Sequence, residues 1–417
     1  MANYPNHAQV TRRALAVQPA WIRTALAKQS KRLIEYYCLY GDLVVSGKPA
    51  ERKIMERFMV MPDGKRAVMG PSSLDERENA RVWYDAFQYW YAAAAHAVKH
   101  NRIADAAQFL GVISHALGDT TALAHPLSHS EGLRMELIKR LFPTKKKYRY
   151  MSLHNLLENL PTSFSITGHR PVLLGRTPDE AAFMTAQSMV QLATRTLAKL
   201  SSAIKALYAD NISRVQRIAG DAYADSSRVY ADIVFTAFSI GAGKYEPADV
   251  DGMKNEKLRL DTLVPYAMSG WSPHPYFFKQ LYNAPCNFNR QMEPFPLMLR
   301  DGGGRRRQYV HGFGAGISSF IEYRLPKNTF RQFTCIIGLN DGLVQRTPAL
   351  VEIKDGTRVL FSRKFKTKQE VAHVTIDLAG VNSLRFETAA VGKYEKFGTV
   401  DCHIVIADPV LERTAVT

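Results

Sequence analysis

The chain has 417 residues, of which 46% are hydrophobic and 22% charged, a globular composition with enough length for two domains. No apolar run reaches the roughly 18 residues of a membrane-spanning helix, and the first residues show no apolar signal segment. The formal net charge of +17 favours anionic partners such as phospholipid surfaces, nucleic acid or acidic glycans.

The first part of the chain has helical periodicity almost throughout, up to about Phe238. Pro19 suits a helical first turn, and a serine with acidic residues opens the stretch that begins at Ser72. Almost nothing here alternates with period two. The predicted helices are residues 19–37, 72–100, 103–119, 179–210 and 226–241.

A stretch rich in Gly, Pro and charge, residues 241–257, reads as a linker. Beyond it, short β-type runs alternate with Gly, Asp and Asn turns, and Asp355-Gly356 marks a hairpin. Several such runs at regular spacing predict a β-sandwich. The predicted strands lie in residues 318–326, 330–339, 349–365, 371–380 and 383–390.

Histidines and carboxylates with metal-ligand spacing occur in two stretches of the helical part. His115 and Asp119 are four residues apart and share one helix face. His125 follows roughly 80° further around an ideal helix, and His154 and Glu158 repeat the four-residue spacing. One such pair alone is usually a surface pair or a core histidine. The combination, in apolar surroundings, favours zinc, which takes imidazole nitrogens and carboxylate oxygens at about 2 Å.

These motifs resemble those of the bacterial zinc-dependent phospholipase C family, which is related to the single-strand-specific zinc nucleases. In that family HxxxDxxxxxH is followed by HxxxE in the phospholipases and by HxxxD in the nucleases. Glu158 therefore favours the phospholipase branch. The resemblance covers roughly residues 5–240 and implies an all-helical domain with two or three Zn²⁺ ions in one cleft.

The resemblance also implies which residues hold the metal. Asp119 would bridge two ions, and Asp42 would also orient the attacking water. The family places a further histidine just before the Pro62-Asp63 turn, where this chain has Arg57 and Phe58. The implied sets are His125, His154 and Glu158 around the ion with an open position, His115, Asp119 and Asp42 around a second, and His7 with Asp119 around a third.

A basic loop connects the two motifs, which both line the expected cleft. Its charges could bind the phosphate of a substrate or an anionic membrane surface. A solvated surface loop is the alternative. The residues concerned are Lys145, Lys146, Lys147 and Arg149.

The last part, about residues 258–415, resembles the NPCBM domain, a carbohydrate-binding type of sandwich attached to glycosidases and other secreted enzymes. The runs "HGFGAGISSFIEYRLP" and "VEIKDGTRVLFSRKF" carry the resemblance. The family has a histidine in its GxGxHA turn, where this chain has Gly314-Ala315-Gly316. Glycan contact and membrane-surface contact therefore both stay open.

The expected architecture is an all-α domain at 1–240, a linker at 241–257 and an all-β, jelly-roll-like sandwich at 258–417. The expected activity is zinc-dependent hydrolysis of a phospholipid or other anionic phosphodiester by a secreted or periplasmic enzyme. One alternative is a zinc nuclease or phosphatase that acts on nucleic acid or phosphomonoesters. Another is a metal-stabilised binding or structural protein that lost catalysis with the absent histidine, unless a residue such as His129 substitutes for it.

Cysteine usage leaves the redox compartment open. The four cysteines lie far apart and form no CxxC pair, which argues against a cysteine-based zinc site. Cys286, Cys335 and Cys402 fall in the last part of the chain, where two of them could form one disulfide.

Overall fold

The computed structural model divides the chain into two units, Met1–Lys254 and Asn255–Thr417. No helix among the described residues is both long and apolar enough to cross a membrane. The described residues are 5–46, 48–59, 79–123, 125, 157, 160–246, 249, 257–263, 265–270, 296–301, 303–316, 318–342, 348–392 and 403–414.

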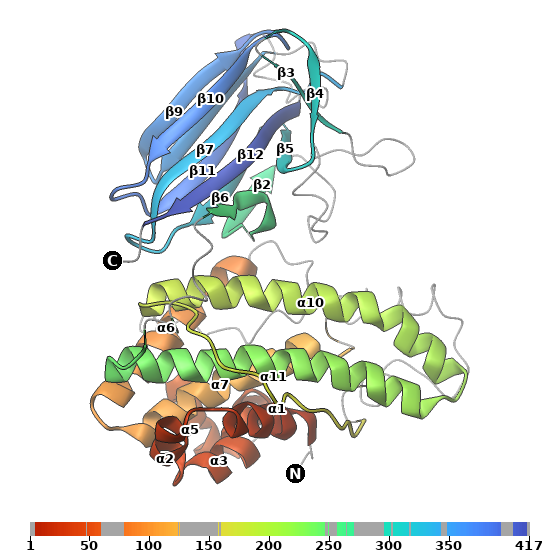
Figure 1. Cartoon of the computed structure of the whole chain (residues 1–417), viewed down its shortest axis with the longest axis vertical. Helices are drawn as coiled ribbons and strands as arrows, with labels where there is room; N and C mark the ends of the chain where they lie inside the picture. Colours follow the sequence, from red (N-terminus) through yellow and green to blue (C-terminus); the bar gives the residue numbers. More distant parts are fainter. Residues whose placement is uncertain are drawn as a thin grey trace. The chain divides into compact units, whose positions relative to one another are not determined.

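The first unit is helical in all its regular described elements, as the sequence predicts (Figure 1). Two helices, α10 and α11, run antiparallel as a long hairpin, and α6 and α7 pack against them. The elements are α1 (Pro5–Ala16), α2 (Ala20–Leu26), α3 (Ser30–Glu35), η1 (Tyr37–Leu39), α4 (Tyr40–Ser46), α5 (Pro49–Met59), α6 (Asn79–Lys99), α7 (Ile103–Thr121), α10 (Pro178–Tyr208) and α11 (Ile212–Ala242).

Local signals explain where the long hairpin begins and ends. The Thr177 hydroxyl accepts a hydrogen bond from the Glu180 amide at the start of α10, with proline in its first turn. Asn211 caps α11 in the same way, and Gly243 ends it in the left-handed conformation with φ of 60°. The helix predicted from residue 226 therefore begins earlier, at Ile212.

One predicted helix, residues 19–37, is wrong as a single element, because the chain breaks it into α2, α3 and η1. No glycine or proline lies within the breaks. The cause is tertiary: η1 packs directly on α7, and a Cβ at Gly111 would overlap Tyr37. The short turn can approach α7 only because Gly111 has no side chain.

The core of the helical unit is aromatic and aliphatic, and α7 is its most deeply buried helix, with every residue from Gly111 to Thr121 buried. Three aromatic residues of α6, Tyr84, Trp90 and Tyr91, belong to this core and are at most 4% exposed. The Tyr91 hydroxyl hydrogen-bonds to Thr185 at 2.8 Å, so its polar end is satisfied inside the core.

The second unit consists of antiparallel strands in two main sheets. One has the order β1-β12-β7-β10 with β5 also paired to β12, and the other has the order β2-β6-β11-β8-β9. A small pair, β3-β4, accompanies them. The strands are β1 (Lys257–Arg259), β2 (Ala267–Gly270), β3 (Leu297–Arg300), β4 (Arg306–Tyr309), β5 (Gly312–Gly316), β6 (Ser319–Arg324), β7 (Phe330–Leu339), β8 (Ala349–Asp355), β9 (Arg358–Phe365), β10 (Val371–Asp377), β11 (Ser383–Ala390) and β12 (His403–Arg413).

The two sheets share an aromatic core, which makes the unit a sandwich. Phe386 on β11 contacts Phe313 on β5 and Phe333 on β7, with ring centroids 5.4 and 5.7 Å apart. The five predicted strand regions are all confirmed, and the predicted hairpin joins β8 to β9 with Gly356 at φ of 57°. The expected order, an all-α part followed by a β-sandwich, is thus confirmed. Cys335 is buried in this core as a free thiol.

Candidate metal centre

The candidate site is built on α7, which carries His115 and Asp119 one turn apart, as the spacing predicts. Both residues are buried, His115 completely and Asp119 to 9% exposure. Ionisable groups at this depth need charged or hydrogen-bonding partners. The partners come from α1 and α4, which lie far from α7 in sequence.

Hydroxyl groups fix α1 against α7 and α11. The Thr11 hydroxyl lies 2.7 Å from that of Ser114 on α7. From α11, Ser227 donates to the Val10 carbonyl at 2.8 Å, and Ser226 donates to the Leu117 carbonyl at 2.9 Å. These buried bonds set the position of α1 along α7, and with it the position of His7.

His7 lies in a space that Gly118 leaves open. A Cβ at Gly118 would overlap the Nδ1 and Cε1 atoms of the His7 ring. The rings of His7 and His115 are stacked almost parallel, with centroids 4.6 Å apart and planes 7° apart. The glycine therefore lets two imidazoles from different helices share one buried space.

The ligand atoms of His7, Asp42 and His115 all lie within 4.8 Å of one another. His115 Nε2 is 3.7 Å from Asp42 Oδ1 and 3.3 Å from Asp119 Oδ2. The other Asp119 oxygen, Oδ1, is 3.5 Å from His7 Nε2. Ligands about 2.1 Å from a tetrahedral zinc ion lie about 3.4 Å apart, so these separations fit a common cation.

His115 presents Nε2 to the site because its other nitrogen is already used. Nδ1 lies 2.9 Å from the carbonyl oxygen of Cys38 on η1, so Nδ1 carries the hydrogen. Nε2 is buried and makes no hydrogen bond within the described part of the chain. A ligating histidine typically has this arrangement, with one nitrogen donating to a backbone carbonyl and the other facing the metal.

The electrostatics of the pair also favour a cation. Burial lowers the pKa of His115, but the nearby carboxylate of Asp119, with a smaller contribution from Asp42, raises this pKa to about 9. Burial would raise the pKa of Asp119, yet His115 and then His125 and His7 hold it well below its usual range. The carboxylates of Asp42 and Asp119 therefore stabilise positive charge in the site, which either a proton or a metal ion can supply.

His125 does not lie on α7, contrary to the helical projection used for the prediction. The helix ends at Thr121, and Ala122 is extended with ψ of 121°. His125 is nevertheless close enough for its charge to lower the pKa of Asp119. Its approach to the site thus depends on the bend after α7 rather than on helical periodicity.

Phe58, which stands where the resemblance expects a histidine, is a core residue with 2% exposure. Its ring packs edge-to-face on Phe109 with centroids 4.9 Å apart, and its carbonyl accepts a hydrogen bond from Trp90. The position has become part of the hydrophobic core. Arg57 is exposed beside it, with its guanidinium 5.6 Å from the Phe58 ring centroid.

The remaining predicted site residues lie outside the described part of the chain and stay predictions. They are His129, Lys145, Lys146, Lys147, Arg149, His154 and Glu158. Sequence reasoning also missed three supporting groups, namely Gly118, the Cys38 carbonyl and Asn6. Gly118 precedes Asp119 directly, so a glycine inside the metal motif was the available signal. The carbonyl of Cys38 lies 77 positions from His115 along the chain, and no sequence signal indicates that the two meet.

Comparisons with known proteins match the two parts of the chain differently. The NPCBM/NEW2 domain family matches residues 280–403. No curated protein matches the sequence. A solved CBM51 module of a GH95 protein from Clostridium perfringens, in complex with methyl-galactose, is similar at 18% identity, covering 37% of this chain and 99% of that chain, with a TM-score of 0.31.

The chain is also similar to two other solved structures. Tandem CBM51 modules of a family 98 glycoside hydrolase from Streptococcus pneumoniae are 17% identical, covering 39% of this chain and 48% of that chain, with a TM-score of 0.32. The alpha toxin from Clostridium absonum is 10% identical, covering 99% of this chain and 94% of that chain, with a TM-score of 0.34. The family match thus gives the chain an NPCBM/NEW2 domain at residues 280–403, within its second unit.

Proposed function

We propose that the helical unit is a zinc-dependent hydrolase of phosphodiesters and that phospholipids are its substrates. The observation that carries this proposal is the convergence of His7, Asp42 and His115 within 4.8 Å, around an otherwise apolar helix. The carboxylate of Asp119 reaches both imidazoles. A donor set of neutral imidazoles and carboxylates suits zinc.

Described residues beside the second motif support the same centre. Leu157 and Leu160, the described residues on either side of Glu158, are buried. The side chain of Asn6 donates to the Leu160 carbonyl at 3.0 Å, and Asn6 directly precedes His7. The chain on the C-terminal side of Glu158 is therefore attached beside His7, which favours His154 and Glu158 as further ligands.

Zinc bound there would lower the pKa of a water molecule and neutralise charge on a phosphoryl group. The side chains provide the rest. Asp42 is the more accessible carboxylate, with 32% of its side chain exposed against 12% for Asp119. Asp42 is thus suited to orient the attacking water and accept its proton, while Asp119 holds the imidazoles. Lys145, Lys146, Lys147 and Arg149 would bind the phosphate of the substrate.

We further propose that the β-sandwich attaches the enzyme to a surface by binding saccharide. The match to the NPCBM/NEW2 family over residues 280–403 supports this role. An enzyme that combines phospholipid hydrolysis with glycan attachment works outside the cytoplasm, which agrees with the secreted location expected from the sequence.

The test uses the full chain loaded with Zn²⁺ and two substrates, phosphatidylcholine vesicles and single-stranded DNA. We expect release of phosphorylated headgroup, loss of that release with a chelator, and loss in His115→Ala. His100→Ala, an exposed histidine at the end of α6, is the control and should retain full activity. Cleavage of DNA alone would make the protein a nuclease. Zinc binding without turnover of either substrate would make it a metal-stabilised binding protein.

A further inference from the structure

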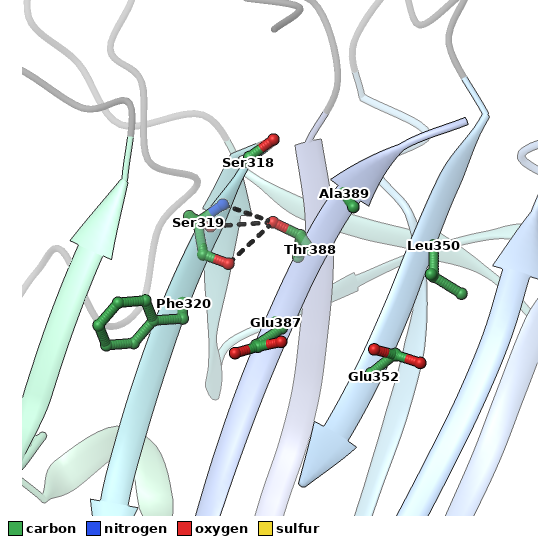
Figure 2. A pocket seen from close by; sticks show the side chains of 8 residues that line it. All are labelled: Ser318, Ser319, Phe320, Leu350, Glu352, Glu387, Thr388 and Ala389. Carbon is green, nitrogen blue, oxygen red and sulfur yellow. Dashed lines mark hydrogen bonds between the residues drawn. The ribbon is translucent and has the colours of Figure 1, made fainter. Parts of the chain in front are cut away.

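The outer face of the sheet β2-β6-β11-β8-β9 contains a hollow of about 230 Å³. Phe320 on β6 and Leu350 on β8 lie on its two sides, with the carboxylates of Glu387 and Glu352 between them (Figure 2). This volume is below the roughly 300–1,000 Å³ of sites for drug-sized ligands. The hollow therefore fits one small ring.

The two carboxylates are held in place by a network on the sheet surface. Lys354 lies 2.6 Å from Glu387 Oε2 and 2.8 Å from Glu352 Oε2. Arg385 contacts Glu387 Oε1 at 2.5 Å, and the Ser362 hydroxyl donates to Glu352 Oε1 at 3.1 Å. Each carboxylate oxygen thus has one donor and keeps a further lone pair for a ligand.

This network decides the charge of the ligand. Lys354 pairs with both Glu352 and Glu387, while Arg385 pairs with Glu387 and also with Glu322, at 3.1 Å. The carboxylates that line the hollow are thus both paired, and the side chains of Glu352, Glu387, Lys354 and Arg385 are only 21–30% exposed. A cationic ligand would lie beside the ammonium group of Lys354 and the guanidinium group of Arg385, which repel it. An anionic ligand would meet two carboxylates. The hollow therefore favours a neutral ligand.

The hydrogen-bond donors and acceptors that line the hollow determine which polar groups the ligand must have. At the upper end of the hollow, the hydroxyls of Ser319 and Thr388 hydrogen-bond to each other at 3.0 Å (Figure 2) and to the Gly316 carbonyl at 2.7 and 2.5 Å. Their hydrogens are thus used, and carboxylates only accept. A neutral ligand must bring several donors of its own, together with an apolar face for Leu350 and Phe320. A sugar ring has both.

We propose that this hollow binds a neutral monosaccharide ring, with Glu352 and Glu387 accepting hydrogen bonds from its hydroxyls. The proposal deepens the saccharide attachment proposed above and rests on it. Phe320 is held beside the ring site by Arg385, whose guanidinium lies 3.6 Å from the Phe320 ring centroid. Binding requires no rearrangement of the side chains that form the hollow.

The test titrates the full chain with methyl galactoside, methyl glucoside and methyl N-acetylglucosaminide, with choline as a cationic probe. We expect a glycoside to bind and choline not to bind. Glu352→Gln removes one charged acceptor and should weaken the glycoside about tenfold. Ala389→Trp fills the hollow and should abolish binding. Thr375→Trp, on an exposed position of β10 in the other sheet, is the matched control and should bind as the wild type does.

The outcomes separate the site from the broader function. If the wild type binds a glycoside and the Glu352 and Ala389 variants bind equally well, this site is refuted while saccharide attachment stands. If no glycoside binds the wild type, both proposals fail. Binding of choline in place of glycosides would overturn the argument for a neutral ligand. Thermal melting of each variant verifies that it is folded.

Discussion

A single methyl group at Gly118 should separate metal binding from folding. In Gly118→Ala the new Cβ would fall on the imidazole of His7, which is buried to 2% exposure and stacked on His115. His7 has to rotate away or shift with α1. In either case one of the three converging ligand atoms leaves the site.

The energetic effects on folding largely cancel. Alanine in place of glycine favours a helix interior by roughly 1 kcal/mol, and overpacking costs about 1–3 kcal/mol. The net loss of stability should lie between zero and about 2 kcal/mol, which shifts the melting temperature of a unit this size by at most about 8 °C. Loss of a ligand should weaken zinc binding about 100-fold or more, because removing a group that only supports a ligand already costs about 10–100-fold.

Calorimetric titration with Zn²⁺ and thermal melting of the chelated protein measure the two effects separately. Gly220→Ala is the matched control, since Gly220 also lies within a long helix and its Cβ would come no closer to another atom than 3.1 Å, from the Ser163 carbonyl oxygen. This control should keep wild-type zinc affinity. If Gly118→Ala also kept it, His7 could not be a ligand, and the proposed centre would be wrong.

Three further outcomes are expected. Folding raises the pKa of His115 from 6.5 to about 9, so its protonated imidazole stabilises the fold fully below pH 6.5. This contribution is lost as the pH rises through 9. The melting temperature of chelated protein should therefore fall between those values, and a flat profile would contradict it. Phe58→His should lower the free energy of unfolding by about 3 kcal/mol in a urea titration. Metal analysis should find no additional bound zinc ion in this variant, and an additional ion would contradict the prediction. Asp42→Asn should weaken zinc binding about 10–100-fold by calorimetry, unlike Asp105→Asn in the first turn of α7, and equal affinities would exclude Asp42 as a ligand.

Periodicity made the sandwich predictable from sequence. In β11 every second residue from Leu384 to Ala390 is buried, an alternation that only a strand with one covered face requires. The shared face of His115 and Asp119 was predictable for the same reason, since four residues make about one helical turn. Local spacing determines both features.

Features that depend on packing between distant parts of the chain could not be predicted from the sequence. The breaks between α2, α3 and η1 follow from the approach of η1 to Gly111, and no local residue marks them. Phe58 looked like a missing ligand, but its role in the core depends on Phe109, 51 positions away along the chain (109 − 58). The hollow in the β-sandwich combines three strands whose adjacency only the sheet order reveals.

The convergence of His7 and His115 has a consequence for how the protein is assembled. The two residues are 108 positions apart (115 − 7) and meet only after α1, η1, α7 and α11 have docked. No short segment of the chain can offer these side chains together, so a cation bound there would arrive after the helices have packed and would not guide their packing. Zinc binding would then indicate that the first unit has finished folding. A chain with a detached α1 would lose the ion while its remaining helices stayed folded.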